Sequence, residues 1–184
     1  MDVFLETDRL VLRRITAADV DDLVALDADP EVMRFLSRHP TPRAEIEERY
    51  LRDRPGRWAA VERSTGDFAG WMALDRPPGD STREMELGYR LRRTVWGRGY
   101  ATEGARALVA KAFADLGAER VWAQTMAVNR GSRRVMEKAG LTYVRTFHVH
   151  FDDPLPGTEH GEVEYELLRA DFSRRSTGGA SPGS

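Results

Sequence analysis

A strand, a glycine-rich turn, a helix and a second strand follow one another in the middle of the chain, and this unit constrains the fold most. Residues 84–91 alternate apolar and polar side chains, as expected of a half-buried strand. Residues 101–116 place apolar side chains at helical spacing, and Gly117 marks the end of this helix. Residues 121–128 form a second strand-like run. Because a crossover helix joins them, the two strands are expected to lie parallel in one sheet.

The other segments add strands that can pair in an antiparallel way. Further strand-like runs occupy residues 8–14, 57–63, 68–75, 141–151 and 162–168. The second and third of these runs are joined by residues 64–67, whose sequence STGD is typical of a tight hairpin turn. The order of elements predicts a mixed α/β, or α+β, fold in which one mostly antiparallel central sheet carries helices on both faces.

Capping residues mark where the other helices begin. The expected helix starts are Thr16, Asp29, Thr41 and Asn129. Thr16 and Asp19 are spaced as in a capping box, with aspartate in the acidic position. Asp29 and Thr41 each precede a proline, which favours helices over residues 30–37 and 42–53. The helix after Asn129 is expected to stop at Gly140.

Length and composition favour a single domain. The chain has 184 residues, of which 41% are hydrophobic, and this is enough apolar surface for one core rather than two. We expect the domain to span residues 1–172 and the small, polar tail 173–184 to be disordered. Residues 1–6 do not resemble a signal peptide, and no later run has transmembrane length. A cytoplasmic location without a membrane partner is therefore expected.

The residue types exclude several kinds of chemistry. The sequence contains no cysteine, so a disulfide framework, a thiolate zinc site and a cysteine nucleophile are all excluded. The four histidines are not spaced as metal ligands, and no metal is expected. A net charge of −2 predicts no general attraction to nucleic acid.

The turn at residues 97–101 is suited to binding an anion. Its two glycines allow close approach of the backbone, and the N–H groups of the following helix point toward the turn. A dinucleotide-binding fingerprint would require glycine where Thr102 stands. A nucleoside-triphosphate loop would require a lysine, which this turn lacks. The bare Gly-x-Gly pattern is also compatible with an ordinary tight connection.

The succession of motifs is more specific than any one of them. In order along the chain these are ELGYRL at 86–91, WGRGYATE at 96–103, NRGS at 129–132 and EKAGL at 137–141. This series resembles the GNAT superfamily of acyl-CoA-dependent N-acyltransferases, and within it the RimJ/RimL type. The resemblance covers Thr7 to about Phe172 and implies a sheet whose parallel strand pair splays apart. It also implies acetyl-CoA as co-substrate.

The resemblance assigns the coenzyme site residue by residue. The family's pyrophosphate loop falls on residues 96–101, with Gly99 and Ala101 at its small positions and Trp96 in place of the usual first residue. The pantetheine arm is expected along the strand that ends at Leu91, and Asn129 is expected to hydrogen-bond it. The full expected coenzyme set is Tyr89, Leu91, Trp96, Gly97, Arg98, Gly99, Tyr100, Ala101, Thr102, Asn129 and Arg134. Arg130 and Arg133 are further candidates for the adenosine phosphates.

Direct attack of an amine on a thioester needs a base for the amine proton and an acid for the leaving thiolate. Glu86, on the polar face of the strand before the loop, is the candidate base; the alternative is a surface carboxylate paired with Arg83 or Arg90. Ser132 falls where RimL-like members place a hydroxyl near the coenzyme sulfur and is the candidate acid. Its alternative role is to satisfy N–H groups in the first helical turn.

Aromatic and histidine side chains give weaker candidates. Tyr143 and Tyr165 are either alternative acids or aromatic residues of the core or cleft. His148 and His150 are expected to share a strand face with Thr146, and they and His160 either contact the substrate or lie at the surface. The Pro- and Gly-rich loop before His160 is either a substrate lid or a wide hairpin connection.

Three functional classes follow. The leading hypothesis is an N-acetyltransferase that transfers an acetyl group from acetyl-CoA to a primary amine, either a protein or peptide N-terminus or a small molecule. The alternative is a non-catalytic acyl-CoA-binding sensor or interaction module on the same fold. A nucleotide-dependent enzyme is disfavoured by the loop spacing. The sequence leaves the acceptor undecided and a homodimer open.

Overall fold

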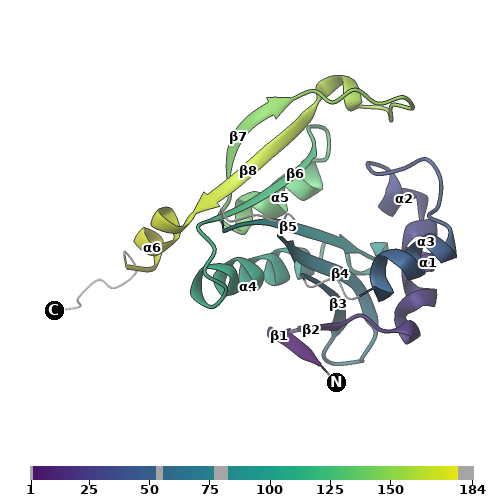
Figure 1. Ribbon diagram of the computed structural model, residues 1–184, viewed down its shortest axis with the longest axis horizontal. Helices are drawn as coiled ribbons and strands as arrows, with labels where there is room; N and C mark the ends of the chain where they lie inside the picture. Colours follow the sequence, from purple (N-terminus) through teal and green to yellow (C-terminus); the bar gives the residue numbers. More distant parts are fainter. Residues whose placement is uncertain (1, 53–55, 77–82, 178–184) are drawn as a thin grey trace.

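The computed structural model describes residues 2–52, 56–76 and 83–177, and its centre is a single eight-stranded sheet (Figure 1). In spatial order the strands are β1 (Val3–Glu6), β2 (Leu10–Arg14), β3 (Arg57–Glu62), β4 (Phe68–Asp75), β5 (Glu84–Leu91), β6 (Arg120–Met126), β8 (Glu162–Leu168) and β7 (Thr142–Phe147). Every neighbouring pair is antiparallel except β5 and β6. The expected mixed fold with one parallel pair is confirmed.

The parallel pair separates along its length. β5 and β6 are in register from Glu84, opposite Arg120, to Glu86, opposite Trp122. β5 then continues to Leu91 while keeping its partner β4, but it has no further register with β6. The two strands therefore splay after Glu86, as the family resemblance implies.

Helices cover both faces of the sheet. α1 (Val20–Ala28), α2 (Pro30–Met33) and α3 (Arg43–Leu51) lie on one side, and α4 (Tyr100–Ala114) and α5 (Arg130–Lys138) lie on the other (Figure 1). α6 (Arg169–Thr177) follows β8. Short 3₁₀ turns occupy Ala17–Asp19, Arg93–Val95 and Thr158–His160. No helix among the described residues is long and apolar enough to cross a membrane.

Each layer of helices encloses its own apolar cluster. The cluster under α4 and α5 includes Met72, Leu87 and Val121, all nearly inaccessible to solvent. The cluster under α1 and α3 includes Leu23 and Ile46, both inaccessible to solvent. In the first cluster, a Cβ on Gly104 of α4 would lie 2.2 Å from the Met72 sulfur. Glycine at this position therefore lets α4 pack closely on β4.

Most predicted capping residues act as caps in the structure. The Asp19 carboxylate accepts the Thr16 N–H at 2.8 Å, and Asp29 accepts the Glu31 N–H at 2.9 Å. The Asn129 side chain accepts the Ser132 N–H at 3.2 Å. Thr41 is not a cap, because the helix after it begins at Arg43 and is preceded directly by Pro42.

Several predicted boundaries are wrong. β1 was not expected, and the helix expected over 30–37 ends at Met33 because residues 34–36 leave it as turns. The strand expected over 141–151 ends at Phe147, where β7 loses its pairing with β8. Disorder was expected from residue 173, but residues 173–177 belong to α6, whose Phe172 stacks on Phe113 with 4.8 Å between ring centroids. Residues 178–184, the rest of that tail, lie outside the described residues.

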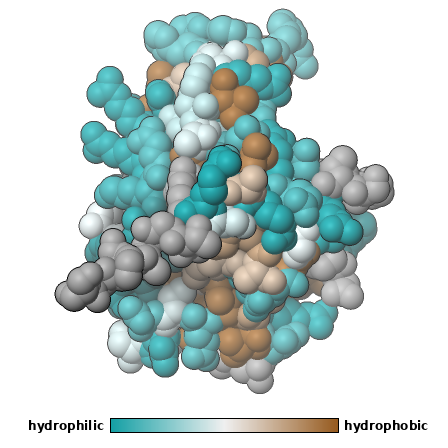
Figure 2. All heavy atoms as spheres, turned by 90° about the vertical axis from the view of Figure 1, so that its left-hand side faces the viewer, coloured by the Kyte–Doolittle hydropathy of each residue, from teal (hydrophilic) through white to brown (hydrophobic). Residues whose placement is uncertain are grey.

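The surface toward α6 is mainly hydrophilic. Figure 2 views the molecule from this side and shows polar side chains over most of it, with apolar side chains exposed along a narrow band. Arg174 of α6 forms an ion pair with Asp171, and on the opposite side of the molecule (Figure 1) Arg52 pairs with Glu48 of α3. This pattern fits the sequence, in which 28 cationic residues are nearly balanced by 30 acidic ones.

Candidate functional site

The glycine-rich turn presents an open backbone at the start of α4. Gly97 and Gly99 both have left-handed φ angles, +72° and +82°, which glycine adopts without steric cost. Gly99 precedes the first helical residue, and its carbonyl oxygen accepts the Glu103 N–H at 3.0 Å. The N–H groups of Tyr100, Ala101 and Thr102 consequently have no partner within the helix. The turn is exposed, and its free N–H groups lie at the positive end of α4, an arrangement that favours negative charge.

Side chains from distant segments brace this turn. Arg9 on the β1–β2 connection donates to the Arg98 carbonyl oxygen at 2.7 Å and also to the Glu103 carboxylate. The Trp96 indole N–H donates to the Leu91 carbonyl oxygen at 2.8 Å, although the ring is largely exposed. The Arg98 guanidinium lies 3.1 Å from Glu62, with which it forms an ion pair. Arg98 is thus held beside the turn by a carboxylate.

Tyr89, Ser132 and Asn129 come together beside the splayed strands. The Tyr89 hydroxyl donates to the Ser132 carbonyl oxygen at 3.1 Å and lies 2.9 Å from the Ser132 hydroxyl. Burial raises the pKa of Tyr89 to about 12, against the opposing effect of its hydrogen bond with Ser132. The Asn129 amide nitrogen donates to the Thr125 hydroxyl at 3.0 Å. Two hydroxyls and an amide therefore converge where β6 passes into α5.

Glu86 lies at the last paired position before the splay. Its strand neighbours are Asp75 on β4 and Trp122 on β6. Asp75 is bound by Arg57 at 2.7 Å, and no described residue forms a hydrogen bond or ion pair with the Glu86 side chain. Burial and the Asp75 charge raise the pKa of Glu86, while Arg57 partly opposes them. A carboxylate of this kind holds a proton more readily than a surface glutamate does.

The alternative pairing of Glu86 with a neighbouring arginine is not found. Arg90 instead pairs with the buried Asp27 of α1. Arg83 lies 3.9 Å from Glu119. Arg83 and Arg90 therefore pair with other carboxylates rather than with Glu86.

The arginines of α5 do not act as a group. Arg133 turns inward, donating to the Tyr165 hydroxyl at 3.1 Å and to the Ala127 carbonyl oxygen at 3.0 Å. Arg134 and Arg130 are exposed. Arg133 is therefore a structural residue here, and only the other two point to solvent.

The two candidate tyrosines differ. Tyr165 is buried and donates to the Glu137 carboxylate at 3.0 Å, as a core residue would. Tyr143 is more than half exposed and is bonded to Thr146 at the sheet edge. Neither hydroxyl joins the cluster of Tyr89 and Ser132.

The histidines lie outside the strand that was expected to carry them. Because β7 ends at Phe147, His148 and His150 belong to the β7–β8 loop and share no strand face with Thr146. The His148 Nε2 lies 3.4 Å from the Glu159 carbonyl oxygen, and His160 lies 3.6 Å from the Glu159 carboxylate. His150 is almost fully exposed. In the described ranges, no three His, Cys, Asp or Glu side chains are grouped as metal ligands.

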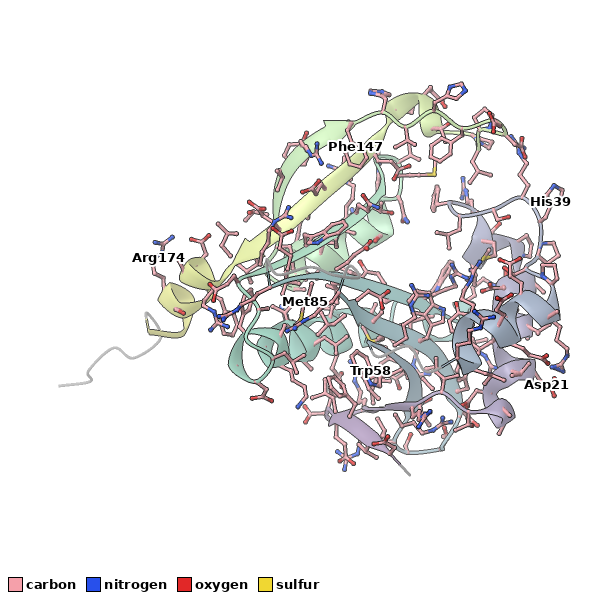
Figure 3. All side chains as sticks on the ribbon, in the orientation of Figure 1. Asp21, His39, Trp58, Met85, Phe147 and Arg174 are labelled. Atoms are coloured by element: carbon pink, nitrogen blue, oxygen red, sulfur yellow. The ribbon has the colours of Figure 1, made fainter. Side chains whose placement is uncertain are left out.

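A hollow of about 200 Å³ lies between the α2–α3 connection and the β7–β8 loop. In Figure 3, His39 marks the first of these segments, below the tip of the second. The lining of the hollow includes Phe35, Leu36, Arg38, Met126, Leu155 and Glu162, together with polar residues such as His39 and Thr158. Sequence reasoning missed this hollow, because its walls come from three segments far apart in the chain. Two features of the sequence pointed toward it: the Pro- and Gly-rich loop before His160, and the alternation of Glu162, Glu164 and Glu166 along one strand.

Comparisons with known proteins agree with this geometry. A profile of the Acetyltransferase (GNAT) domain family matches residues 9–142. An FsC-acetyl coenzyme A-N(2)-transacetylase of Aspergillus fumigatus is 36% identical over 184 residues, covering 92% of this chain and 78% of the relative.

Solved structures extend the likeness to the whole fold. A spermidine N-acetyltransferase of Vibrio cholerae, in complex with CoA and spermine, has a TM-score of 0.76 at 14% identity, covering 91% of this chain and 99% of that one. RimL, a ribosomal L7/L12 alpha-N-protein acetyltransferase in complex with coenzyme A, has a TM-score of 0.75 at 16% identity, with coverages of 91% and 98%. At these identities the likeness concerns the fold alone. The profile match and the relative of Aspergillus fumigatus go further, and the chain belongs to the GNAT family of N-acetyltransferases.

Proposed function

We propose that the protein transfers an acetyl group from acetyl-CoA to a primary amine by direct attack of the amine. The observation that carries this proposal is Glu86, a half-buried carboxylate with a raised pKa at the point where β5 and β6 separate. An unpaired carboxylate at this position is suited to accept the proton that an attacking amine loses.

The donor is proposed to lie along the splay and over the turn before α4. The N–H groups of residues 97–102 would hold the pyrophosphate, and Trp96 would flank it. Tyr89, Leu91 and Asn129 would line the pantetheine arm. Arg134 and Arg98 would lie near the phosphates. Arg98 forms an ion pair with Glu62, so it would have to break this pair or bind a phosphate while keeping it. The left-handed glycines and the unpartnered N–H groups of α4 support this placement.

The proposed chemistry needs one base and one acid. The amine nitrogen forms a bond to the thioester carbonyl carbon while Glu86 takes its proton, directly or through a water molecule. The carbon–sulfur bond breaks, and the Ser132 hydroxyl supplies a proton to the leaving sulfur. The products are an amide and free CoA thiol. Proton exchange with water then returns Glu86 to the carboxylate and Ser132 to the hydroxyl, so the proton lost by the amine balances the one gained by sulfur.

The acceptor is proposed to be a primary amine of a small molecule or of a protein N-terminus, as in RimJ/RimL-like enzymes. Two comparisons support this range. The name of the relative of Aspergillus fumigatus describes acetyl transfer from acetyl-CoA to a nitrogen, and the enzyme of Vibrio cholerae binds spermine. RimL acts on a protein α-amine. The open hollow at the β7–β8 loop offers space for either acceptor.

Donor binding is tested by isothermal titration of the protein with acetyl-CoA. We expect saturable heat and competition by free CoA, and their absence would contradict the proposal. Thiol release is then followed with a panel of small amines and N-terminal peptides. Saturable acetyl-CoA binding without thiol release for any amine would identify the alternative function, a non-catalytic binding module.

A further inference from the structure

The sheet face opposite α5 carries a row of carboxylates, most of which are neutralised. Strand register places Glu84 and Glu86 of β5 on this face, together with Glu162, Glu164 and Glu166 of β8. Arg120 of β6 binds Glu84 at 2.8 Å and Glu166 at 2.7 Å, and it also binds Glu164. Arg145 adds a second bond to Glu164 at 2.7 Å. Three of the five carboxylates thus have arginine partners.

The other two carboxylates, Glu86 and Glu162, receive no hydrogen bond or ion pair from any described residue. Glu162 lines the hollow, beside Met126 in strand register. Burial raises the pKa of Glu162, as it does that of Glu86. Each carboxylate is therefore partly withdrawn from water without a hydrogen-bonded cation, and the charge of Arg57 offsets this only in part at Glu86. Such an arrangement is costly unless a bound cation compensates it.

The arginine in the same hollow does not neutralise Glu162. Arg38 lies 3.2 Å from Asp153 and also donates to the Pro154 carbonyl oxygen. This pair joins the α2–α3 connection to the β7–β8 loop, and both of its residues line the hollow. The other walls combine apolar side chains, among them Phe35, Leu36 and Leu155, with the polar residues Ser37, His39 and Thr158. None of these polar residues, all within the described ranges, forms a hydrogen bond or ion pair with Glu162. The hollow therefore places an unpaired carboxylate beside apolar side chains.

We propose that the acceptor carries a second cationic group, joined by an apolar spacer to the amine that is acetylated, and that Glu162 binds this second group. The inference rests on the proposed function, because it places the reacting amine at Glu86. Along β6, Trp122 and Met126 are four residues apart, or about 13 Å. Glu86 and Glu162 lie one strand to either side, which makes the backbone separation about 16 Å. A long diamine spans this distance, and a short one does not.

The test compares α,ω-diamines, from diaminobutane to diaminododecane, with amino alcohols of the same length. The amino alcohol keeps the reacting amine and the spacer but lacks the second charge. We expect kcat/KM for the long diamines to exceed that of the matched amino alcohols by about tenfold to a hundredfold, as expected for a charge-assisted hydrogen bond. The advantage should vanish for diaminobutane.

Glu162→Gln should abolish the diamine advantage while leaving the amino alcohols unaffected. Glu48→Gln makes the same change of charge on the exposed side of α3, away from the hollow, and should keep the advantage. If Glu162→Gln does not fold, the wild-type comparison and Glu162→Asp still decide, because the shorter side chain should favour longer diamines. Equal kcat/KM for diamines and amino alcohols, or an advantage that survives in Glu162→Gln, overturns the inference alone. Absence of thiol release with every amine overturns the proposed function as well.

Discussion

Glu86 carries both the proposed chemistry and a cost in stability. Because its pKa is raised in the folded protein, the charged form is less favourable there than in the unfolded chain. The folded protein therefore loses stability as pH rises through the unfolded and then the folded pKa of this group. Glu86→Gln removes the charge, and we expect equal or higher thermal stability at neutral pH.

Glu86→Gln should lower activity, although it should preserve or raise thermal stability. We expect kcat to fall by about a hundredfold or more, the range of general base catalysis. In the wild type, kcat/KM should decline as pH falls, with a midpoint above the ordinary range of a glutamate, and Glu86→Gln should lose this acidic limb. The measurement is a pH–rate profile paired with a melting curve. Full turnover in Glu86→Gln, or activity lost together with stability, would contradict the assignment.

Tyr89 is expected to position the Ser132 hydroxyl rather than to react. Its pKa of about 12 keeps it protonated at any ordinary assay pH, so it should contribute no limb to the pH profile. Tyr89→Phe removes the hydroxyl at 2.9 Å and should lower kcat by about tenfold with little change in KM for acetyl-CoA. Ser132→Ala should lower kcat further, and the double variant should match Ser132→Ala alone. Additive losses in this cycle would show that the two hydroxyls act independently.

At the scale of single elements, the start of α1 depends on a buried ion pair. Asp19 accepts hydrogen bonds from Arg13 at 2.7 and 2.8 Å and from the Thr16 N–H. Burial opposes ionisation of Asp19, but these hydrogen bonds outweigh it and hold its pKa below the ordinary range. The stabilisation is therefore present above the unfolded pKa and is lost as pH falls through the folded pKa.

Asp19→Ala is expected to lower the free energy of unfolding by about 3 kcal/mol at neutral pH, because Arg13 is left without its partner. The difference from wild type should shrink as pH falls below 4, roughly the unfolded pKa of an aspartate. Urea denaturation at several pH values measures both effects. Asp21→Asn, on the exposed side of the same helix, serves as control and should change stability by less than about 0.5 kcal/mol. A loss at Asp19 that does not depend on pH would argue against the ion pair.

Sequence reasoning at this scale was most successful where a local rule decides the structure. The caps at Asp29 and Asn129 and the hairpin at residues 64–67 depend on neighbouring residues only, and the structure contains all three. The predicted ends of β7 and α2 were wrong, because the position of each end depends on contacts with segments that are distant in the sequence. β1 was missed because a strand of four residues depends on distant contacts, namely its pairing with β2 and the stacking of Phe4 on Trp58.

At the scale of the whole molecule, Arg120 joins three strands across the parallel pair. Its side chain binds Glu84 of β5 and Glu164 and Glu166 of β8, so it connects the N-terminal half of the sheet to the β7–β8 hairpin. Arg120→Ala leaves these carboxylates facing one another. We expect a loss of about 2 kcal/mol, less than for a fully buried pair because the cluster is partly exposed to water.

Hydrogen exchange should show where this loss acts. Amides of β8 and β7 in Arg120→Ala should exchange faster than those of β3 and β4, which form the far side of the sheet. Arg52→Ala, which breaks an exposed pair on α3, should leave both groups of strands unchanged. A uniform increase across all strands would contradict a local role for Arg120.

The candidate site shows the same division between local and distant information. The turn at 96–101 and the polar face that carries Glu86 were visible in the sequence, because each is a short pattern. The sequence did not show that Glu86 lacks an arginine partner. This depends on two distant ion pairs, Arg90 with Asp27 and Arg83 with Glu119. Glu162 and the hollow beside it depend on the folded positions of two loops.

The most direct test of the account measures both products of one reaction. The protein is incubated with acetyl-CoA and a primary amine, and free CoA thiol and acetylated amine are quantified together. The account predicts that both products form in equal amounts, that their formation requires the amine, and that Glu86→Gln slows both alike. Thiol release that does not depend on the amine, or no acetylated product from any amine, would contradict it.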